Sequence, residues 1–228
     1  MARTLIIACG ALAREITAVI AANSWRHVTV ECLPPELHNR PEKIPAAVEQ
    51  KIRDARARFT HIFCAYADCG TGGLLDRVLA AEGVERLPGA HCYEFYAGTR
   101  AFAALADAEP GSFYVTDFLV RHFERLVIRG LGLDRHPELA PLYFGNYRRL
   151  VYLAQRTDDG LVAQARAAAE RLGLAFEQRL TGYGELEHGL VRFVQGDDEQ
   201  CDGGAVARDE SGRGPAAAST MERTRWPG

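Results

Sequence analysis

The sequence lacks an apolar run long enough to cross a membrane, which would need about 18 residues or more. The apolar stretch near its start, Leu5 to Cys9, is also too short for the hydrophobic region of a signal peptide. The six cysteines are irregularly spaced and do not resemble the disulfide framework of a small secreted protein. These absences predict a cytoplasmic protein with no membrane partner.

Strong charge of one sign is missing as well. The formal net charge is −3 at pH 7, and the arginines are scattered among acidic residues instead of forming a basic stripe. A nucleic-acid backbone would need such a stripe, so nucleic acid is not a predicted partner. The glycine-rich segment Gly70 to Gly73 lacks the Lys-Ser/Thr pair of a phosphate-binding loop and does not follow the first strand, as a dinucleotide fingerprint should.

Two common metal-binding signatures are also absent. No C-x-x-C pair occurs, which excludes a zinc ribbon, and no H-x-x-x-H spacing occurs. We therefore interpret most of the histidines as surface residues or as residues satisfied by structural hydrogen bonds. That group comprises His27, His38, His61, His122, His136 and His188.

Short β-rich segments alternate with helical patterns along the chain. This alternation predicts an α/β fold, namely a doubly wound, mostly parallel sheet with helices on both faces in a single domain. The expected strands cover residues 4–9, 28–32, 62–66, 84–87, 113–115, 149–154 and 174–180, and the expected helices cover residues 12–22, 41–58, 74–82, 118–128 and 158–172.

The composition changes near residue 196. From there to the end the chain is rich in Asp, Glu, Gly, Ser, Arg and Ala and shows no periodicity. Such a segment has too little apolar surface to offset the entropy lost on ordering. We therefore expect an α/β domain over residues 1–195 and a disordered tail over residues 196–228.

Three cysteines fall in turns that follow predicted strands. Cys9 ends the first strand, Cys69 follows the third, and Cys92 follows the fourth. In the common strand order 2-1-3-4 the carboxyl ends of strands one and three are neighbours at the point where the order reverses, and ligands bind there. Glycines beside these turns would let the backbone approach a ligand closely, and they are Gly10, Gly70, Gly72 and Gly73.

Three convergent thiols are typical of a zinc site, or of an iron–sulfur cluster with one open iron. The fourth ligand would be His91, a carboxylate, water or substrate. The alternative interpretation is that each thiol is a small buried apolar side chain. We favour that alternative for Cys32 and Cys64, which lie inside strands, and we regard Cys201 in the tail as incidental.

Four segments together give the sequence a family resemblance, and they are Ala8-Cys9-Gly10, Tyr66-x-x-Cys69-Gly70, Pro88-Gly-Ala-His91-Cys92 and Pro110-Gly-Ser-Phe-Tyr114-Val-Thr116. With these segments the sequence resembles the family called domain of unknown function 1638 over roughly residues 3–195, although members usually read His-Asp-Cys at His91-Cys92 and Thr-Pro at Thr116-Asp117. The resemblance implies an uncharacterised cytoplasmic α/β protein, often encoded beside corrinoid-dependent methyltransferases.

Two functional hypotheses follow. In the first, Cys9, Cys69, Cys92 and His91 hold zinc or an iron–sulfur cluster for one-carbon or corrinoid-linked methyl transfer, either within a methyltransferase system or as a redox protein. Zinc would activate a thiol as the methyl acceptor, whereas a cluster would pass electrons. In the second, the protein is a non-catalytic module that binds a corrinoid or a small anionic ligand in the same crevice. The sequence leaves the oligomeric state open.

Overall fold

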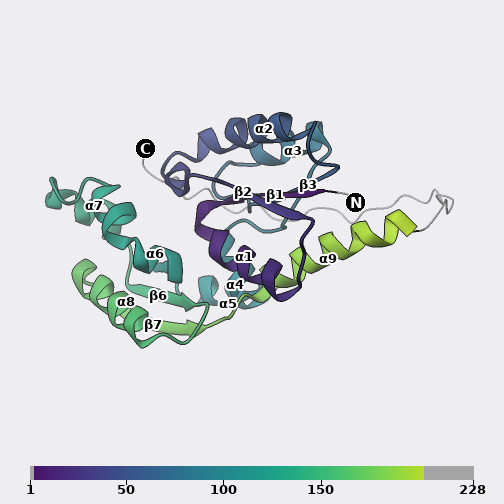
Figure 1. Ribbon diagram of the computed structural model, residues 1–228. Helices are drawn as coiled ribbons and strands as arrows, with labels where there is room; N and C mark the ends of the chain where they lie inside the picture. Colours follow the sequence, from purple (N-terminus) through teal and green to yellow (C-terminus); the bar gives the residue numbers. More distant parts are fainter. Residues whose placement is uncertain (1–2, 203–228) are drawn as a thin grey trace.

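The strands of the protein form two parallel sheets that are joined by helices (Figure 1). The computed structural model describes the backbone of residues 3–202 and the side chains of residues 3–196. Within those residues the first sheet has four strands and the second has three. The predicted doubly wound α/β class is confirmed, with the strands divided between two sheets.

The first sheet has the strand order β2-β1-β3-β4, which is the order expected from the sequence. Its centre is β1, whose residues are all buried, because an inner strand of a parallel sheet is covered on both faces. The strands of this sheet are β1 (Thr4–Cys9), β2 (Val28–Leu33), β3 (His61–Ala65) and β4 (Glu85–Arg86).

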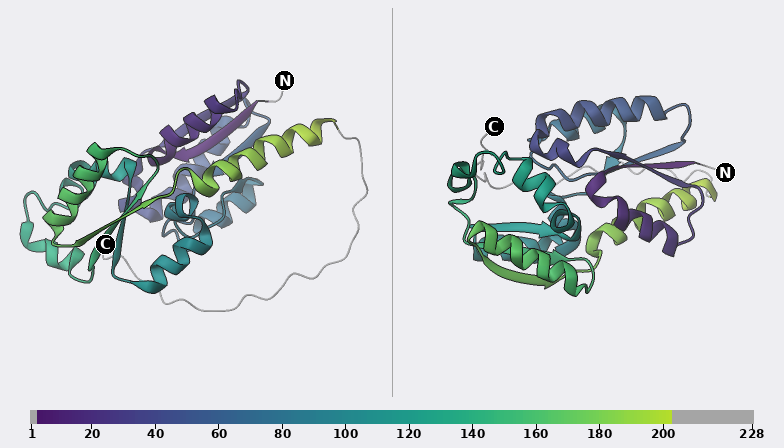
Figure 2. Two further views of the ribbon diagram at one scale, coloured as in Figure 1. Left: turned by 90° about the horizontal axis from the view of Figure 1, so that it is seen from below. Right: turned by 60° about the vertical axis from the view of Figure 1, so that its left-hand side comes forward.

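Helices cover both faces of the first sheet, as Figure 2 shows most clearly. On one face α2 (Ile44–Ala55) packs beside α3 (Leu74–Glu82). On the other face α1 (Ala13–Ala22) lies beside α9 (Gly184–Asp202), which returns from the far end of the described chain. Apolar residues at helical spacing face the sheet, and Ile16 and Val19 of α1 are buried there.

The second sheet has the order β5-β6-β7, and two different helix pairs cover its faces. Helices α6 and α8 pack over one face, whereas α4 and α5 supply the apolar contacts on the other. The elements are β5 (Ser112–Thr116), β6 (Arg149–Ala154), β7 (Ala175–Leu180), α4 (Cys92–Ala97), α5 (Thr99–Ala108), α6 (Asp117–Arg121) and α8 (Asp159–Leu172).

Short helical pieces complete the described chain. One of them is a π-helical segment, where the sequence predicted the end of a regular helix. These pieces are the 3-10 segments Gly10–Leu12, Pro35–Asn39, Pro41–Lys43 and Pro137–Leu139, the π-helix Glu124–Arg129 and α7 (Ala140–Phe144).

The carboxyl ends of the two sheets approach each other. The 3-10 segment Gly10–Leu12 begins where β1 ends, and α6 begins where β5 ends. Helix α6 contacts this 3-10 segment directly. In parallel sheets, turns at these strand ends are where ligands bind, so the junction of the halves is the place to look for a site.

Four helices were not expected from the sequence, namely α4, α5, α7 and α9. Helix α9 continues to Asp202, past the expected domain boundary at residue 195. The remainder of the predicted tail, residues 203–228, lies outside the described residues, so the expectation of disorder stays a prediction there. None of the helices in the described part of the chain is both long and apolar enough to cross a membrane.

Candidate metal centre

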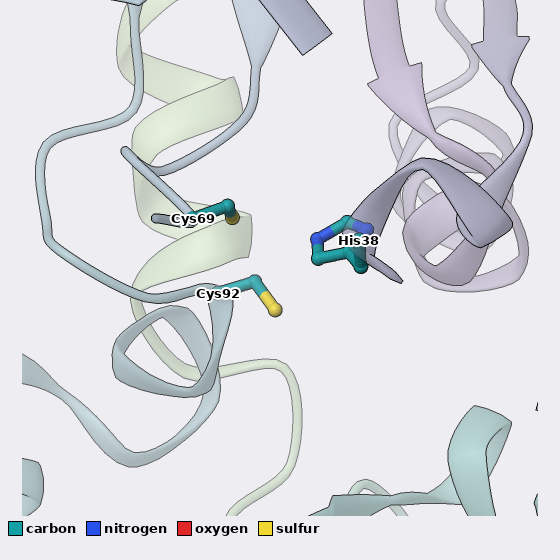
Figure 3. A group of neighbouring side chains, drawn as sticks. All are labelled: His38, Cys69 and Cys92. Atoms are coloured by element: carbon teal, nitrogen blue, oxygen red, sulfur yellow. The ribbon is translucent and has the colours of Figure 1, made fainter. Parts of the chain in front are cut away.

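One histidine and two cysteines come together near the carboxyl end of the first sheet. The ligand atoms of His38, Cys69 and Cys92 all lie within 4.8 Å of one another (Figure 3). The two thiols stand on one side, and His38 faces them from the other with a ring nitrogen directed toward the sulfurs. All three residues are half-buried.

Backbone hydrogen bonds hold the two cysteines side by side. The turn that follows β3 and the segment before α4 pair with each other: the amide of Asp68 donates to the carbonyl of Gly89 at 3.1 Å, and the amide of Cys69 donates to the carbonyl of Ala90 at 2.9 Å. Because β3 and β4 are neighbouring parallel strands, the segments after them leave the sheet at the same edge. Cys92 then begins α4, two residues beyond this pairing.

Cys69 has an unusual backbone conformation. Its φ is +50°, in the left-handed region that residues other than glycine rarely occupy, and Gly70 follows at φ +85°. A non-glycine residue in this region costs on the order of 1–3 kcal/mol and persists only when the surrounding structure enforces it. The turn therefore directs the Cys69 thiol at a conformational cost.

The Asp68 carboxylate is what enforces the turn. It accepts hydrogen bonds from the Thr71 hydroxyl at 2.6 Å, the Gly72 amide at 3.1 Å and the Gly73 amide at 2.9 Å. Burial raises the pKa of Asp68, but these hydrogen bonds outweigh it, so this pKa lies below its ordinary value. The amides of Gly72 and Gly73 are thus occupied by the protein's own carboxylate.

His38 lies on the 3-10 segment after β2, and one of its ring nitrogens is already engaged. Its Nδ1 is 3.3 Å from the carbonyl oxygen of Pro35 and 3.7 Å from the Sγ of Cys9. The ring is also stacked near Tyr66, with centroids 6.2 Å apart. Contacts of this kind on one nitrogen fix the orientation of a ligating imidazole, which leaves Nε2 for the metal. The Tyr66 hydroxyl is buried without a hydrogen-bond partner among the described residues.

The two thiols of the group differ in pKa. A hydrogen bond from the Cys92 thiol, helped by His38, holds the pKa of Cys69 well below its ordinary value despite burial. The same contact with Cys69 raises the pKa of Cys92 well above its ordinary value. Burial lowers the pKa of His38, but its contacts with Cys69 and Cys9 outweigh burial and raise it. Cys69 is therefore the more acidic thiol of the pair.

Cys9 lies beside this group without joining it. Its Sγ accepts a hydrogen bond from the Ala11 amide at 3.3 Å and contacts the far side of the His38 ring. Gly10 makes the approach possible, since a Cβ there would lie 3.2 Å from both the Leu33 carbonyl oxygen and the Pro35 side chain. The glycine thus lets the segment that carries His38 pack against the end of β1.

The other candidate residues are placed elsewhere. His91 is exposed and precedes α4; its backbone amide donates to the Glu94 carboxylate at 3.1 Å, and its ring meets Phe102 edge-on. Cys32 is exposed, whereas Cys64 is fully buried, and that burial raises its pKa to about 12. The side chain of Cys201 lies outside the described residues.

His38 is the member of the group that sequence reasoning missed. It has no ligand spacing to another histidine, and Pro34-Pro35 obscures the segment that carries it. One signal was nevertheless available. Residues 34–40 follow β2, and β2 neighbours β1 in the expected strand order, so a ligating residue type here falls at the same sheet edge as Cys9.

Comparison with known proteins bears on this group. A search of curated proteins gave no match to the chain. The family model described as "Protein of unknown function (DUF1638)" matches residues 32–190. That range contains His38, Cys69 and Cys92 and begins after Cys9. Since the match covers well over half of the chain, the protein belongs to the DUF1638 family.

Proposed function

We propose that His38, Cys69 and Cys92 bind a single zinc ion and leave a fourth position open to a small-molecule substrate. The observation that carries this proposal is the closeness of the three ligand atoms, all within 4.8 Å of one another. Tetrahedral zinc with bonds of about 2.0–2.3 Å needs its ligand atoms roughly 3.3–3.8 Å apart, which small side-chain rotations supply. A cubane cluster would need its thiolates on separate irons and therefore farther apart.

Each residue has a distinct role in this proposal. Cys69 is ready to bind as a thiolate, and Cys92 releases its proton when metal arrives. His38 binds through Nε2 as a neutral imidazole, while the Pro35 carbonyl and Cys9 hold its Nδ1 side. Cys9 thus orients a ligand and is not itself one, which departs from the three-cysteine site expected from the sequence.

Two thiolates and one imidazole with an open position form the donor set of catalytic zinc sites. When bound, zinc lowers the pKa of a coordinated thiol substrate, which makes that thiol a methyl acceptor at neutral pH. A role in one-carbon transfer fits this chemistry, and its link to corrinoid-dependent enzymes comes from the family resemblance alone.

Metal analysis tests the proposal. Protein purified anaerobically and exchanged against zinc should hold one equivalent, and cobalt-loaded protein should show thiolate-to-metal charge-transfer absorption. Alkylation of the thiols before loading should abolish both signals. A zinc content of less than about a tenth of an equivalent would contradict the metal centre, because a preformed thiolate site should bind zinc tightly enough to hold close to one equivalent.

A second candidate function is thiol redox chemistry, which the contact between Cys69 and Cys92 favours. Hydrogen peroxide would oxidise the Cys69 thiolate to a sulfenic acid, and the leaving hydroxide would take a proton from solvent to become water. The Cys92 sulfur would then attack the sulfenic sulfur and release a second water, which forms the disulfide. Mass spectrometry after peroxide treatment separates the candidates. Rapid disulfide formation that zinc does not slow would favour the redox function, whereas protection of both thiols by zinc favours the metal centre.

A further inference from the structure

A second polar group lies where the two halves meet. Glu15 is in the first turn of α1, directly after the 3-10 segment that contacts α6. Asp117 and Arg121 lie at the two ends of α6, directly after β5. Glu15, Asp117 and Arg121 together are called the junction cluster below. Its members come from the carboxyl ends of both sheets.

Asp117 is firmly fixed by its neighbours. Its Oδ1 accepts hydrogen bonds from the Tyr152 hydroxyl at 2.7 Å and from the Gln155 amide at 3.1 Å. Its own amide donates to the Gln155 side chain at 2.8 Å. Its Oδ2 lies 3.5 Å from Arg121 Nη2 and 3.7 Å from Arg156 Nε. This carboxylate is a structural anchor that positions Arg121.

The other two members have unused hydrogen-bonding capacity. Glu15 is only 4% exposed, and its Oε2 has no hydrogen-bond partner among the described residues. The Nη2 of Arg121 is likewise buried and makes no hydrogen bond with the described residues, its approach to Asp117 being an ion-pair contact only. A buried polar atom without a partner costs about 1–3 kcal/mol, so two at one junction call for an explanation.

The junction cluster is close to the candidate metal centre. The Sγ of Cys9 lies 3.7 Å from the Nδ1 of His38 and accepts a hydrogen bond from the Ala11 amide in the 3-10 segment Gly10–Leu12. Helix α6, which carries Asp117 and Arg121, contacts that segment, and Glu15 follows the segment on α1. The junction cluster therefore borders the segment whose first turn packs against His38.

We infer that the junction cluster binds the carboxylate of a small organic thiol, whose sulfur occupies the open position beside His38, Cys69 and Cys92. The Arg121 guanidinium offers a charged donor, for which a carboxylate is the fitting acceptor. Burial, together with the Asp117 charge, raises the pKa of Glu15, so its carboxyl group favours the protonated form that donates a hydrogen bond. Only one part of this inference rests on the proposed function, namely the place of the ligand's sulfur at the zinc ion.

The test uses the full chain and three probes: mercaptoacetate, 3-mercaptopropionate and 2-mercaptoethanol. The zinc-loaded protein should bind at least one of the two acids about tenfold more tightly than 2-mercaptoethanol, which lacks the carboxylate. Glu15→Leu and Arg121→Met should each remove this advantage, and Glu15→Gln, which keeps a donor, should restore most of it. Arg125→Met, at an exposed ion pair with Glu36, is the matched control and should bind like the parent.

Two measurements separate failure of this inference from failure of the metal centre. Zinc content is determined for every variant and should not change, and circular dichroism reports whether each is folded. Propionate is titrated into metal-free protein, where Arg121-dependent binding should persist. Equal affinity of the zinc-loaded parent for all three thiols, or unchanged acid binding by a folded Glu15→Leu protein, would overturn the inference. Propionate binding without any zinc binding would overturn the metal centre alone.

Discussion

Both sheets present side chains at the carboxyl ends of their strands, but the two sets of side chains differ in chemical type. The edge of the first sheet presents sulfur and imidazole nitrogen on strained or irregular turns, at Cys69 and on the 3-10 segment of His38. The edge of the second presents carboxylate and guanidinium on α6, which the Thr116 hydroxyl caps. Soft donors of this kind suit a metal ion, whereas a guanidinium group suits an organic anion, as proposed above. The fold provides the position and the side chains provide the selectivity.

Loss of a metal ligand is the largest effect that this comparison predicts. Cys69→Ser, Cys92→Ser or His38→Gln should each reduce zinc content to less than about a tenth of the parent value at micromolar metal. Cys32→Ser is the matched control, because this thiol is exposed and does not belong to the group. The zinc content of each purified protein is measured by elemental mass spectrometry. Full zinc content in His38→Gln would restore the sequence-based assignment of Cys9 or His91 as the remaining ligand.

The next largest effect concerns stability and involves the second sheet. Asp117→Ala removes a buried carboxylate that pairs with Arg121 and accepts hydrogen bonds from Tyr152 and Gln155, so it should lower the free energy of unfolding by about 3–5 kcal/mol, measured by urea denaturation. Zinc content should stay near one equivalent. Asp134→Ala, at an ion pair on the surface, should change stability by less than about 0.5 kcal/mol. Loss of zinc from a folded Asp117→Ala protein would mean that the two edges do not act separately.

Cys9 provides a sharper test of the first edge. Cys9→Ser should weaken zinc binding by about 10- to 100-fold without abolishing it, because it alters the residue that orients His38. Competition with a chromogenic chelator measures this affinity. An affinity loss as large as that of Cys69→Ser would make Cys9 a ligand.

The smallest predicted effects involve glycines of the first sheet. Gly70→Val should cost on the order of 1–3 kcal/mol, because φ is +85° there, and should weaken zinc binding by displacing Cys69. Gly83→Ala, at the end of α3 with open space around it, should cost about 1 kcal/mol and leave zinc binding unchanged. Thermal unfolding and metal titration on both proteins give the comparison. The reverse pattern would place the site away from Cys69.

The sequence predicted the first sheet and two of the three residues of the candidate group. Alternation of strands and helices predicted a parallel sheet, the common order 2-1-3-4 was expected for it, and turns after its strands contain Cys69 and Cys92. His91 was favoured because it adjoins Cys92 in sequence, but the start of α4 leaves its ring exposed and against Phe102. Adjacency along a chain does not specify the direction of a side chain at a helix start.

The elements that the sequence missed depend on tertiary contacts. Helix α4 has six residues, three of them aromatic, and neither its length nor its helix propensity is sufficient without packing. Its Tyr93 packs against Tyr114 of the second sheet. The division into two sheets has the same origin, since α4 and α5 cover a face of the second sheet that local patterns do not reveal.

The hydrogen bonds that the Asp68 carboxylate accepts from its own turn bear on whether metal binding is needed for folding. In small zinc domains the metal organises the chain, and chelation unfolds it. Here hydrogen bonds to Asp68 hold the Cys69 turn, and the turn lies on an extensive buried core. The hydrogen bonds and the core form without a metal contact. The thiol is therefore preorganised, and we expect the proposed zinc to exchange without unfolding of the chain. A chelator should empty the site and leave the far-ultraviolet circular dichroism unchanged, and reloading should need no refolding.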